Sequence, residues 1–213
     1  MASQVLQERQ ALADLLREVG PDAPTLCTGW DTRVLLAHLV RRERSLLEIG
    51  ARARLPIATA AADKAMRAYA DSTSYEEMLA TLQDGAPPWS FFALPPAREA
   101  FNLLEYAIHS EDVRRVDPTA EPRQLSNARQ HAIFNRLTGM ARFAMRGTPV
   151  AVELRWSDSD VIKVGRGSRP VKVSGEPMEL ALVAYGRQPV AKVHYSGDAA
   201  AIARLTGARL GVG

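Results

Sequence analysis

The sequence predicts a mainly α-helical protein, an antiparallel four-helix bundle followed by a small α+β domain. Before Gly147, apolar residues recur at helical spacing between capping residues and glycines. After Gly147, short runs of β-branched residues alternate with polar ones, as they do in strands. The 213 residues are 46% hydrophobic, which is enough to bury a core in one or two domains. We therefore predict a helical domain over residues 1–147 and an α+β domain over residues 148–213.

Four long helices and one short helix are predicted in the first domain. Ser3 and Asp31 precede the first two amphipathic runs as caps, and Gly20 and Gly50 follow them as helix stops. The stretch STSYEEMLATLQDG has a serine and a glutamate in the spacing of a capping box, which predicts the short helix. The predicted helices cover residues 4–19, 32–49, 75–84, 97–117 and 127–146.

Strands and helices are both predicted in the second domain. The runs VAVELRW, VIKVG, PVKVS and VAKVHYSG have the alternation of strands. GEPMELALVAYG and DAAAIARLTG have the pattern of helices, the first with Pro177 near its start. The predicted order is three strands, a helix, a strand and a helix.

Composition and charge narrow the class of protein. No apolar run approaches the ~20 residues of a membrane span, and the N-terminal MASQVLQERQ lacks the apolar segment of a secretory signal. Cys27 is the single cysteine, so no internal disulfide can form, which fits a reducing compartment. We expect a cytoplasmic protein without a membrane partner. Because the net charge of +3 is spread along the chain, we expect no nucleic-acid partner, although a basic accessory protein that binds nucleic acid is an alternative.

The stretch FNLLEYAIHSEDVRR, residues 101–115, places polar groups in a predicted core. Phe101, Leu104 and Ile108 mark a face that should be buried, and Glu105 and His109 lie on or beside the same face. A buried carboxylate is costly unless it is paired or bound to a metal. The pattern therefore predicts a partner for Glu105 elsewhere in the chain.

Two histidines of the first domain could be that partner. His38 is flanked by valine and leucine in RVLLAHLV, whereas His131 lies on a more polar stripe, so His38 is the better candidate. From a neighbouring helix, His38 would complete a set of two imidazoles and one carboxylate with Glu105 and His109. Three protein ligands leave coordination positions open, as catalytic zinc sites do. Asp112, one turn beyond His109, could orient a ligand.

These residues also have a purely structural interpretation. A glutamate and a histidine four residues apart on a helix are common by chance, and a core histidine is more often hydrogen-bonded than metal-bound. Asp112 could pair with arginines on a solvated face. We assign His131 and His194 to structural roles. We also assign Cys27 to a structural role, because His38 lies about 10 Å along its helix from the cap at ~1.5 Å per residue.

The basic stretch KVGRGSRPVK, residues 163–172, lies between two predicted strands. Its four cations surround glycines and could meet a phosphate. The glycines do not have P-loop spacing, however. We therefore assign this stretch to an exposed hairpin turn.

Three segments resemble the mycothiol-dependent maleylpyruvate isomerase family, within the DinB-like metalloproteins of actinobacteria. PDAPTLCTGWDTRVLLAHLVRRE is similar to the family signature C-P-G-W-x-x-x-x-L-x-x-H-L, with Thr28 where the family usually has proline. NLLEYAIHSEDVRR resembles the second metal motif, E-x-x-x-H, with the D-V-R-R ending of an uncharacterised metal-binding branch. VSGEPMELALVAYGRQ is similar to a family segment that ends in G-R, so the resemblance covers nearly the whole chain.

The resemblance implies a DinB-like bundle in which His38, Glu105 and His109 hold a divalent metal. Imidazole and carboxylate ligands accept both zinc and nickel, and we expect zinc. It also implies that a low-molecular-weight thiol, mycothiol, binds the metal as a thiolate. The implied activity is that of an isomerase or transferase that acts on a small carboxylate or electrophilic metabolite. Arg187 matches an arginine of the smaller domain, and we expect it to act in catalysis by holding a substrate carboxylate. The alternative is a protein that binds a metal or ligand without catalysis.

Overall fold

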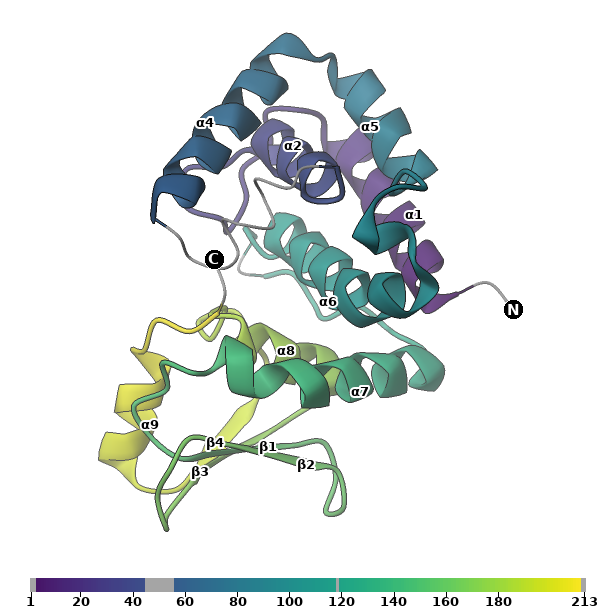
Figure 1. Ribbon diagram of the computed structural model, residues 1–213. Coiled ribbons are helices and arrows are strands. Elements are labelled where there is room, and N and C mark those ends of the chain that lie inside the picture. Colours follow the sequence, from purple (N-terminus) through teal and green to yellow (C-terminus); the bar gives the residue numbers. More distant parts are fainter. Residues whose placement is uncertain (1–2, 45–55, 118, 212–213) are drawn as a thin grey trace. The chain divides into compact units, whose positions relative to one another are not determined.

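The computed structural model describes residues 3–44, 56–117 and 119–211. The chain divides into two compact units, Met1–Ala120 and Glu121–Gly213, and we describe each unit by itself. Helices make up the first unit, and helices with a small sheet make up the second (Figure 1). This confirms the prediction of a mainly helical protein with strands in its C-terminal part. Within the described ranges, none of the helices has the length and apolar character that a membrane crossing requires.

The first unit begins its helices where the sequence predicts. Asp31 Oδ1 accepts a hydrogen bond from the backbone N–H of Val34 at 2.8 Å, and Ser74 and Glu77 form the predicted capping box. The predicted end of the second helix at Gly50 lies outside the described residues. The helices are α1 (Gln4–Val19), α2 (Thr32–Arg42), α4 (Pro56–Ser72), α5 (Tyr75–Asp84), the 3₁₀ helix η1 (Phe91–Ala93) and α6 (Pro95–Arg114).

Periodicity does not predict helix α4. Its sequence, PIATAAADKAMRAYADS, has few large apolar residues to mark a face, although alanine is the strongest helix former. In the structure, α2 packs against α4 and α5, and α1 packs against α5 and α6 (Figure 1). Fully buried leucines and a methionine form the core between these helices. They include Leu12, Leu16, Leu35, Leu36, Leu39, Met78, Leu79 and Leu82.

The second unit contains a mixed sheet in the order β2-β1-β3-β4. Strand β1 pairs antiparallel with β2 and parallel with β3, and β3 pairs antiparallel with β4. The predicted order of three strands, a helix, a strand and a helix is confirmed. The elements are α7 (Asn127–Ala144), β1 (Val152–Arg155), β2 (Val161–Val164), β3 (Val171–Ser174), α8 (Pro177–Ala184), β4 (His194–Ser196) and α9 (Ala199–Thr206).

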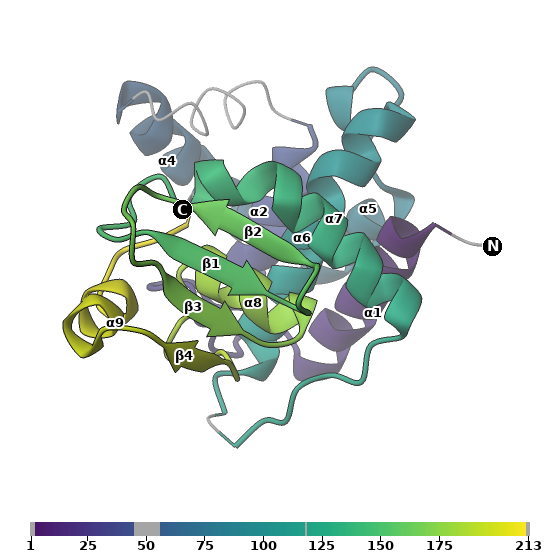
Figure 2. The ribbon, with the colours of Figure 1, turned by 90° about the horizontal axis from the view of Figure 1, so that it is seen from below.

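The two faces of the sheet differ in polarity. Figures 1 and 2 show α7 and α8 on one face. Side chains alternate between the two faces along a strand, so every second residue points to the face that α7 and α8 cover. The aliphatic side chains on this face are buried. On the opposite face, Glu153 pairs with Arg155 at 2.8 Å and with Lys163 at 3.5 Å. The buried set is Val152, Leu154, Ile162, Val164, Val171 and Val173.

Helix α7 lies in the second unit, where it packs against α8 and β2. The sequence analysis groups this helix with the N-terminal helices. Periodicity marks the apolar face of α7, on which Ile133, Leu137 and Ala141 are buried, but it does not identify the element that covers this face. The boundary between the two compact units lies between residues 120 and 121. Whether residues 1–147 and 148–213 fold as independent domains stays a prediction.

Candidate metal centre

Helices α2 and α6 bring His38, Glu105 and His109 together. The Nε2 atom of His38 lies 3.1 Å from Glu105 Oε1, and the Nε2 atom of His109 lies 3.6 Å from the same oxygen. One ligand-type atom of each residue lies within 4.8 Å of the other two. Two imidazole nitrogens and a carboxylate oxygen at these separations form a donor set that fits zinc and other divalent metals.

Local structure explains how these side chains are placed. Asp31 caps α2, so His38 falls about two turns into the helix. The ring of Trp30 lies 5.0 Å from the ring of His38. Glu105 and His109 are one turn apart on α6 and therefore share a face. The side chains of His38, Glu105 and His109 are 17%, 10% and 11% exposed, so the cluster is largely covered but still reaches solvent.

Asp112 contacts the far side of the His109 ring. Its Oδ2 lies 2.9 Å from His109 Nδ1, and its side chain is fully buried. A carboxylate at Nδ1 leaves Nε2 as the nitrogen that faces Glu105. Burial by itself lowers the pKa of His109, but hydrogen bonds with Asp112, Cys27 and Glu105 outweigh burial and hold this pKa well above its usual value. Without a metal, the two carboxylates beside the ring therefore favour the protonated form of His109.

Cys27 lies closer to the cluster than the sequence predicts. Its Sγ is 3.3 Å from Asp112 Oδ2 and 3.9 Å from His109 Nδ1. The prediction considered distance along α2 alone, whereas the preceding loop lies against α6, where the backbone N–H of Leu26 donates to the carbonyl of Asp112 at 2.9 Å. Cys27, His109 and Asp112 form a second group of ligand-type atoms within 4.8 Å of one another. Because the thiol and the carboxylate both approach Nδ1, they do not form a nucleophile, base and carboxylate triad.

A buried arginine balances the charge of Glu105. Arg42, one turn after His38 on α2, is 1% exposed, and its Nε lies 3.2 Å from Glu105 Oε1. Its Nη1 donates to Asn102 Oδ1 at 2.6 Å, and its guanidinium lies 4.5 Å from the centre of the Phe92 ring. Sequence reasoning misses Arg42 because the run RRER has the composition of a solvated surface. Only the position of α2 against α6 reveals its role.

Glu43 extends this network into the core of the first unit. Its fully buried side chain accepts hydrogen bonds from Asn102 Nδ2 at 2.9 Å, from Arg9 Nη2 at 3.4 Å and from the hydroxyl of Tyr106. Asn102 therefore connects Glu43 with Arg42. A connected network of this kind restricts the rotamers of its members, so Glu105 is supported by residues well away from the cluster.

Three other positions from the sequence analysis lie in the second unit. Arg187 follows α8, and its Nη1 donates to the carbonyl of Tyr185 at 2.6 Å. Its catalytic role stays a prediction. The ring of His131 lies 4.4 Å from the ring of Trp156, and His194 is exposed at the start of β4. Neither histidine lies among the described groups that could hold a metal.

Two imidazoles and a carboxylate from neighbouring helices form a candidate metal site. These features place the first unit in the class of helical proteins with a candidate metal site. The family model of the mycothiol maleylpyruvate isomerase N-terminal domain matches residues 5–114, a range that contains His38, Glu105 and His109. The chain belongs to this family, which is known for metal binding and for the use of mycothiol. No curated protein and no solved structure matches the chain.

Proposed function

We propose that the first unit binds a divalent metal ion through His38, Glu105 and His109, with zinc preferred over nickel. The observation that carries the proposal is the convergence of three ligand-type atoms from α2 and α6 within 4.8 Å. The contact of Asp112 with the far nitrogen of His109 supports it, because metal-binding histidines usually donate that N–H to a carboxylate or carbonyl.

We further propose that the protein is a mycothiol-dependent isomerase or transferase that acts on a small carboxylate or electrophilic metabolite. Three protein ligands leave coordination positions for a small thiol. A bound divalent cation lowers the pKa of a thiol and favours the thiolate, which is the nucleophile. Membership in the family supports the choice of thiol.

The side chains around the cluster would adjust its charge and protonation. Arg42 offsets the charge of Glu105, so a bound cation would attract an anionic partner such as a thiolate. To become a ligand, His109 must lose the proton at Nε2. Its Nδ1 keeps a proton and donates a hydrogen bond to Asp112. Both residues would thus prepare the cluster for a metal with an anionic ligand.

We propose Arg187 as the residue that binds a substrate carboxylate, because a guanidinium can hold a carboxylate by two parallel hydrogen bonds. Arg187→Ala should raise the KM for a carboxylate substrate and leave the metal content unchanged. Arg187→Lys should restore little, since an ammonium lacks the planar fork. Equal KM values in the wild type and in Arg187→Ala would contradict this role.

We also propose that the N-terminal helices form a DinB-like antiparallel four-helix bundle, and that residues 1–147 and 148–213 are domains. Expression of residues 1–147 and of residues 1–120 tests this proposal. A folded 1–147 fragment together with an unfolded 1–120 fragment would support it. A folded 1–120 fragment would show that α7 is not needed to complete the helical domain.

A protein that binds metal without catalysis is the second candidate. The position of Cys27 and Asp112 beside His109 favours it, because their ligand-type atoms lie at Nδ1, on the opposite side of the ring from His38 and Glu105, and form a second group that could hold a metal ion. A metal ion at Nδ1 would be bound apart from the proposed three-ligand site, and the sulfur among its ligands would be that of Cys27 itself. The two candidates therefore differ in whether Cys27 binds the metal.

The first experiment is elemental analysis of the purified protein. We expect about one divalent ion per chain, and we expect His38→Ala and His109→Ala to lose it. His131→Ala is the matched control, because its ring contacts Trp156 in the second unit. Unchanged metal content in both His38→Ala and His109→Ala would remove the proposed site.

The second experiment uses cobalt to report which sulfur binds the metal. The cobalt-loaded Cys27→Ser variant should show a near-ultraviolet sulfur-to-cobalt band only after a small thiol is added, and the band should saturate. The cobalt-loaded wild type should show no such band before thiol is added. A wild-type band that Cys27→Ser abolishes, with no response to added thiol, would favour the non-catalytic candidate.

A further inference from the structure

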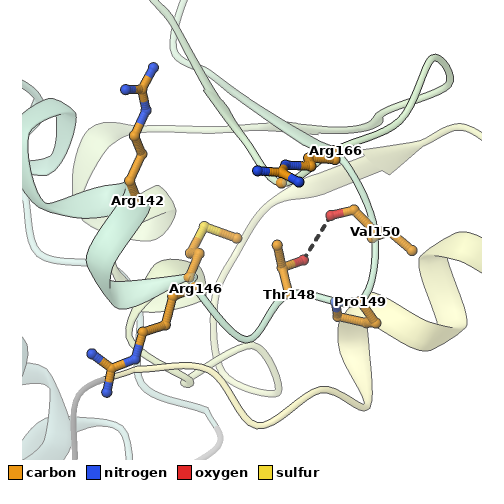
Figure 3. A pocket seen from close by; sticks show the side chains of 8 residues that line it. Arg142, Arg146, Thr148, Pro149, Val150 and Arg166 are labelled. Atoms are coloured by element: carbon orange, nitrogen blue, oxygen red, sulfur yellow. Dashed lines mark hydrogen bonds between the residues drawn. The ribbon is translucent and has the colours of Figure 1, made fainter.

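The second unit carries a basic pocket that the proposed metal chemistry does not use. The pocket has a volume of about 360 Å³. It is formed by the end of α7, the loop before β1 and the turn between β2 and β3 (Figure 3). This turn is part of the basic stretch predicted to be an exposed hairpin turn. Residues 165–169 are exposed, but the hairpin prediction is wrong, because β1 lies between β2 and β3 in the sheet. The lining residues include Arg142, Met145, Arg146, Thr148, Val150 and Arg166.

The three arginines of this pocket lack an acidic partner in the described part of the chain. No carboxylate lines the pocket, and no ion pair joins Arg142, Arg146 or Arg166 to a described residue. In Figure 3, Arg166 projects from the turn, and the guanidinium groups of Arg142 and Arg146 point away from each other at the end of α7. All three residues line the pocket. Like charges around one pocket repel each other, and an anion between them would relieve this repulsion.

Helix capping does not account for these arginines. Basic side chains often hydrogen-bond the free carbonyls at a helix C-terminus. At the end of α7, however, the carbonyl of Ala144 accepts from the backbone N–H of Gly211 at 3.0 Å, and that of Met145 accepts from the backbone N–H of Thr148 at 2.9 Å. These two carbonyls therefore do not engage the arginines. The guanidinium of Arg146 lies over the Phe143 ring, 4.5 Å from its centre, so Arg142 and Arg166 are the arginines that we assign to a ligand.

A glycine brings the turn against the pocket. Gly165 has a φ of +75°, and a Cβ at this position would collide with the carbonyl oxygen of Val150. The absence of a side chain allows the turn to lie against residues 148–150. This close approach places the next residue, Arg166, at the pocket.

The charge of the whole second unit agrees with an anionic ligand. Residues 121–213 contain 14 lysines and arginines against 7 aspartates and glutamates, a net charge of +7. Residues 1–120 contain 13 against 17, a net charge of −4. The modest net charge of +3 for the chain therefore conceals a strongly basic unit, whose field would attract anions.

We propose that this pocket binds a compact organic molecule that carries two or more oxyanion groups, either phosphate or carboxylate. Guanidinium groups recognise both by bidentate hydrogen bonds. Met145, Pro149 and Val150 supply apolar surface for the organic part of the ligand. The volume of about 360 Å³ lies at the lower end of the ~300–1,000 Å³ typical of small-molecule sites. A nucleic acid would need an extended basic track instead.

Calorimetric titration of the full-length protein with inorganic pyrophosphate and with citrate, at constant ionic strength, tests the proposal. We expect saturable binding of at least one probe. Arg166→Ala and Arg142→Ala should each weaken it about tenfold, because each variant loses charge-assisted hydrogen bonds to the oxyanion. Arg169→Ala is the matched control, because Arg169 is exposed on the same turn but does not line the pocket.

The outcomes separate the sources of the oxyanion and the competing explanations. Binding of pyrophosphate alone assigns phosphate, and binding of citrate alone assigns carboxylate. Binding of neither probe overturns the proposal. An equal loss in Arg169→Ala also overturns it, because diffuse surface charge would then explain the binding. A third outcome is tight binding of an oligonucleotide. If Arg169→Ala and Arg166→Ala weaken that binding equally, a nucleic-acid surface would replace the proposed small-molecule site.

Discussion

The two units place their charged residues in opposite ways. In the first unit, Arg9, Arg42 and Glu43 are 6%, 1% and 1% exposed, and hydrogen bonds connect them around the candidate metal centre. In the second unit, Arg142 and Arg166 are exposed at a pocket and have no acidic partner among the described residues. Buried charges must be paired, so they fix one another, whereas exposed charges are solvated and constrain little. The burial of a charged residue thus decides whether it organises a site within its own fold or remains available to a ligand.

The largest effect should come from breaking the buried network. Glu43→Ala would leave Arg9 and Tyr106 without their acceptor and should lower the free energy of unfolding by about 3–5 kcal/mol. The matched change in the second unit is Glu153→Ala. Glu153 is 8% exposed, but its partners Arg155 and Lys163 reach solvent and stay hydrated when the carboxylate is removed, so the change should cost no more than ~1 kcal/mol. Urea denaturation measures both. Similar losses for the two variants would contradict the difference between the units.

A smaller effect should follow from removing the carboxylate behind His109. Asp112→Asn should weaken metal binding about 10–100-fold, because Asp112 orients the imidazole and raises its basicity. Competition with a chelating dye measures the affinity. Asp117→Asn is the control, since that exposed carboxylate accepts hydrogen bonds from the backbone N–H and the hydroxyl of Thr119. Equal affinities for Asp112→Asn and the wild type would show that Asp112 serves the fold alone.

The stability of the metal-free protein should depend on pH through His109. The pKa of His109 is raised in the folded protein above its ordinary value of 6.5, so the folded state binds the proton more tightly than the unfolded state does. This contribution is fully present below about pH 6.5 and is lost as pH rises through the folded pKa. Urea midpoints over this range should fall for the wild type and fall less for His109→Gln. Parallel curves for both proteins would contradict the assignment.

The smallest effects should come from the removal of side chains that cap helices at the surface. Both units have such caps, so we expect similar losses of stability in the two units. Ser74→Ala removes the cap of α5, and Asp198→Ala removes the cap of α9. Each should cost about 1 kcal/mol, because each side chain satisfies a backbone N–H of the first turn. Thermal denaturation followed by circular dichroism measures both losses. A loss in either variant as large as that of Glu43→Ala would show that a cap has a role in packing.

Local features of the sequence predicted much of the fold. The caps Ser3, Asp31 and Ser74 began helices as expected, because a capping hydrogen bond spans only two or three residues. Alternating valines predicted the strands for the same reason. Helix α4 was missed because an alanine-rich helix has high propensity but no marked apolar face.

The candidate metal centre was only partly predictable. Residues four apart share one face in any helix, so the spacing of Glu105 and His109 predicted that they lie together on α6. The apolar neighbours of His38 indicated that His38 points into the core. The structure brings these three side chains together, and their role as metal ligands stays a prediction. The presence of Cys27 beside His109 did not follow from helix geometry, because it depends on the path of a loop.

The sequence by itself therefore determined the caps, the faces of the helices and strands, and the identity of the residues that could bind a metal. Only the tertiary structure decided that α7 packs against α8, that Arg42 pairs with Glu105, and that Arg166 lines a pocket with residues at the end of α7. The physical reason is the range of the interactions. Caps and periodicity act within a few residues, whereas the partner of an apolar face or of a buried charge comes from a distant segment and is selected by packing of the whole unit.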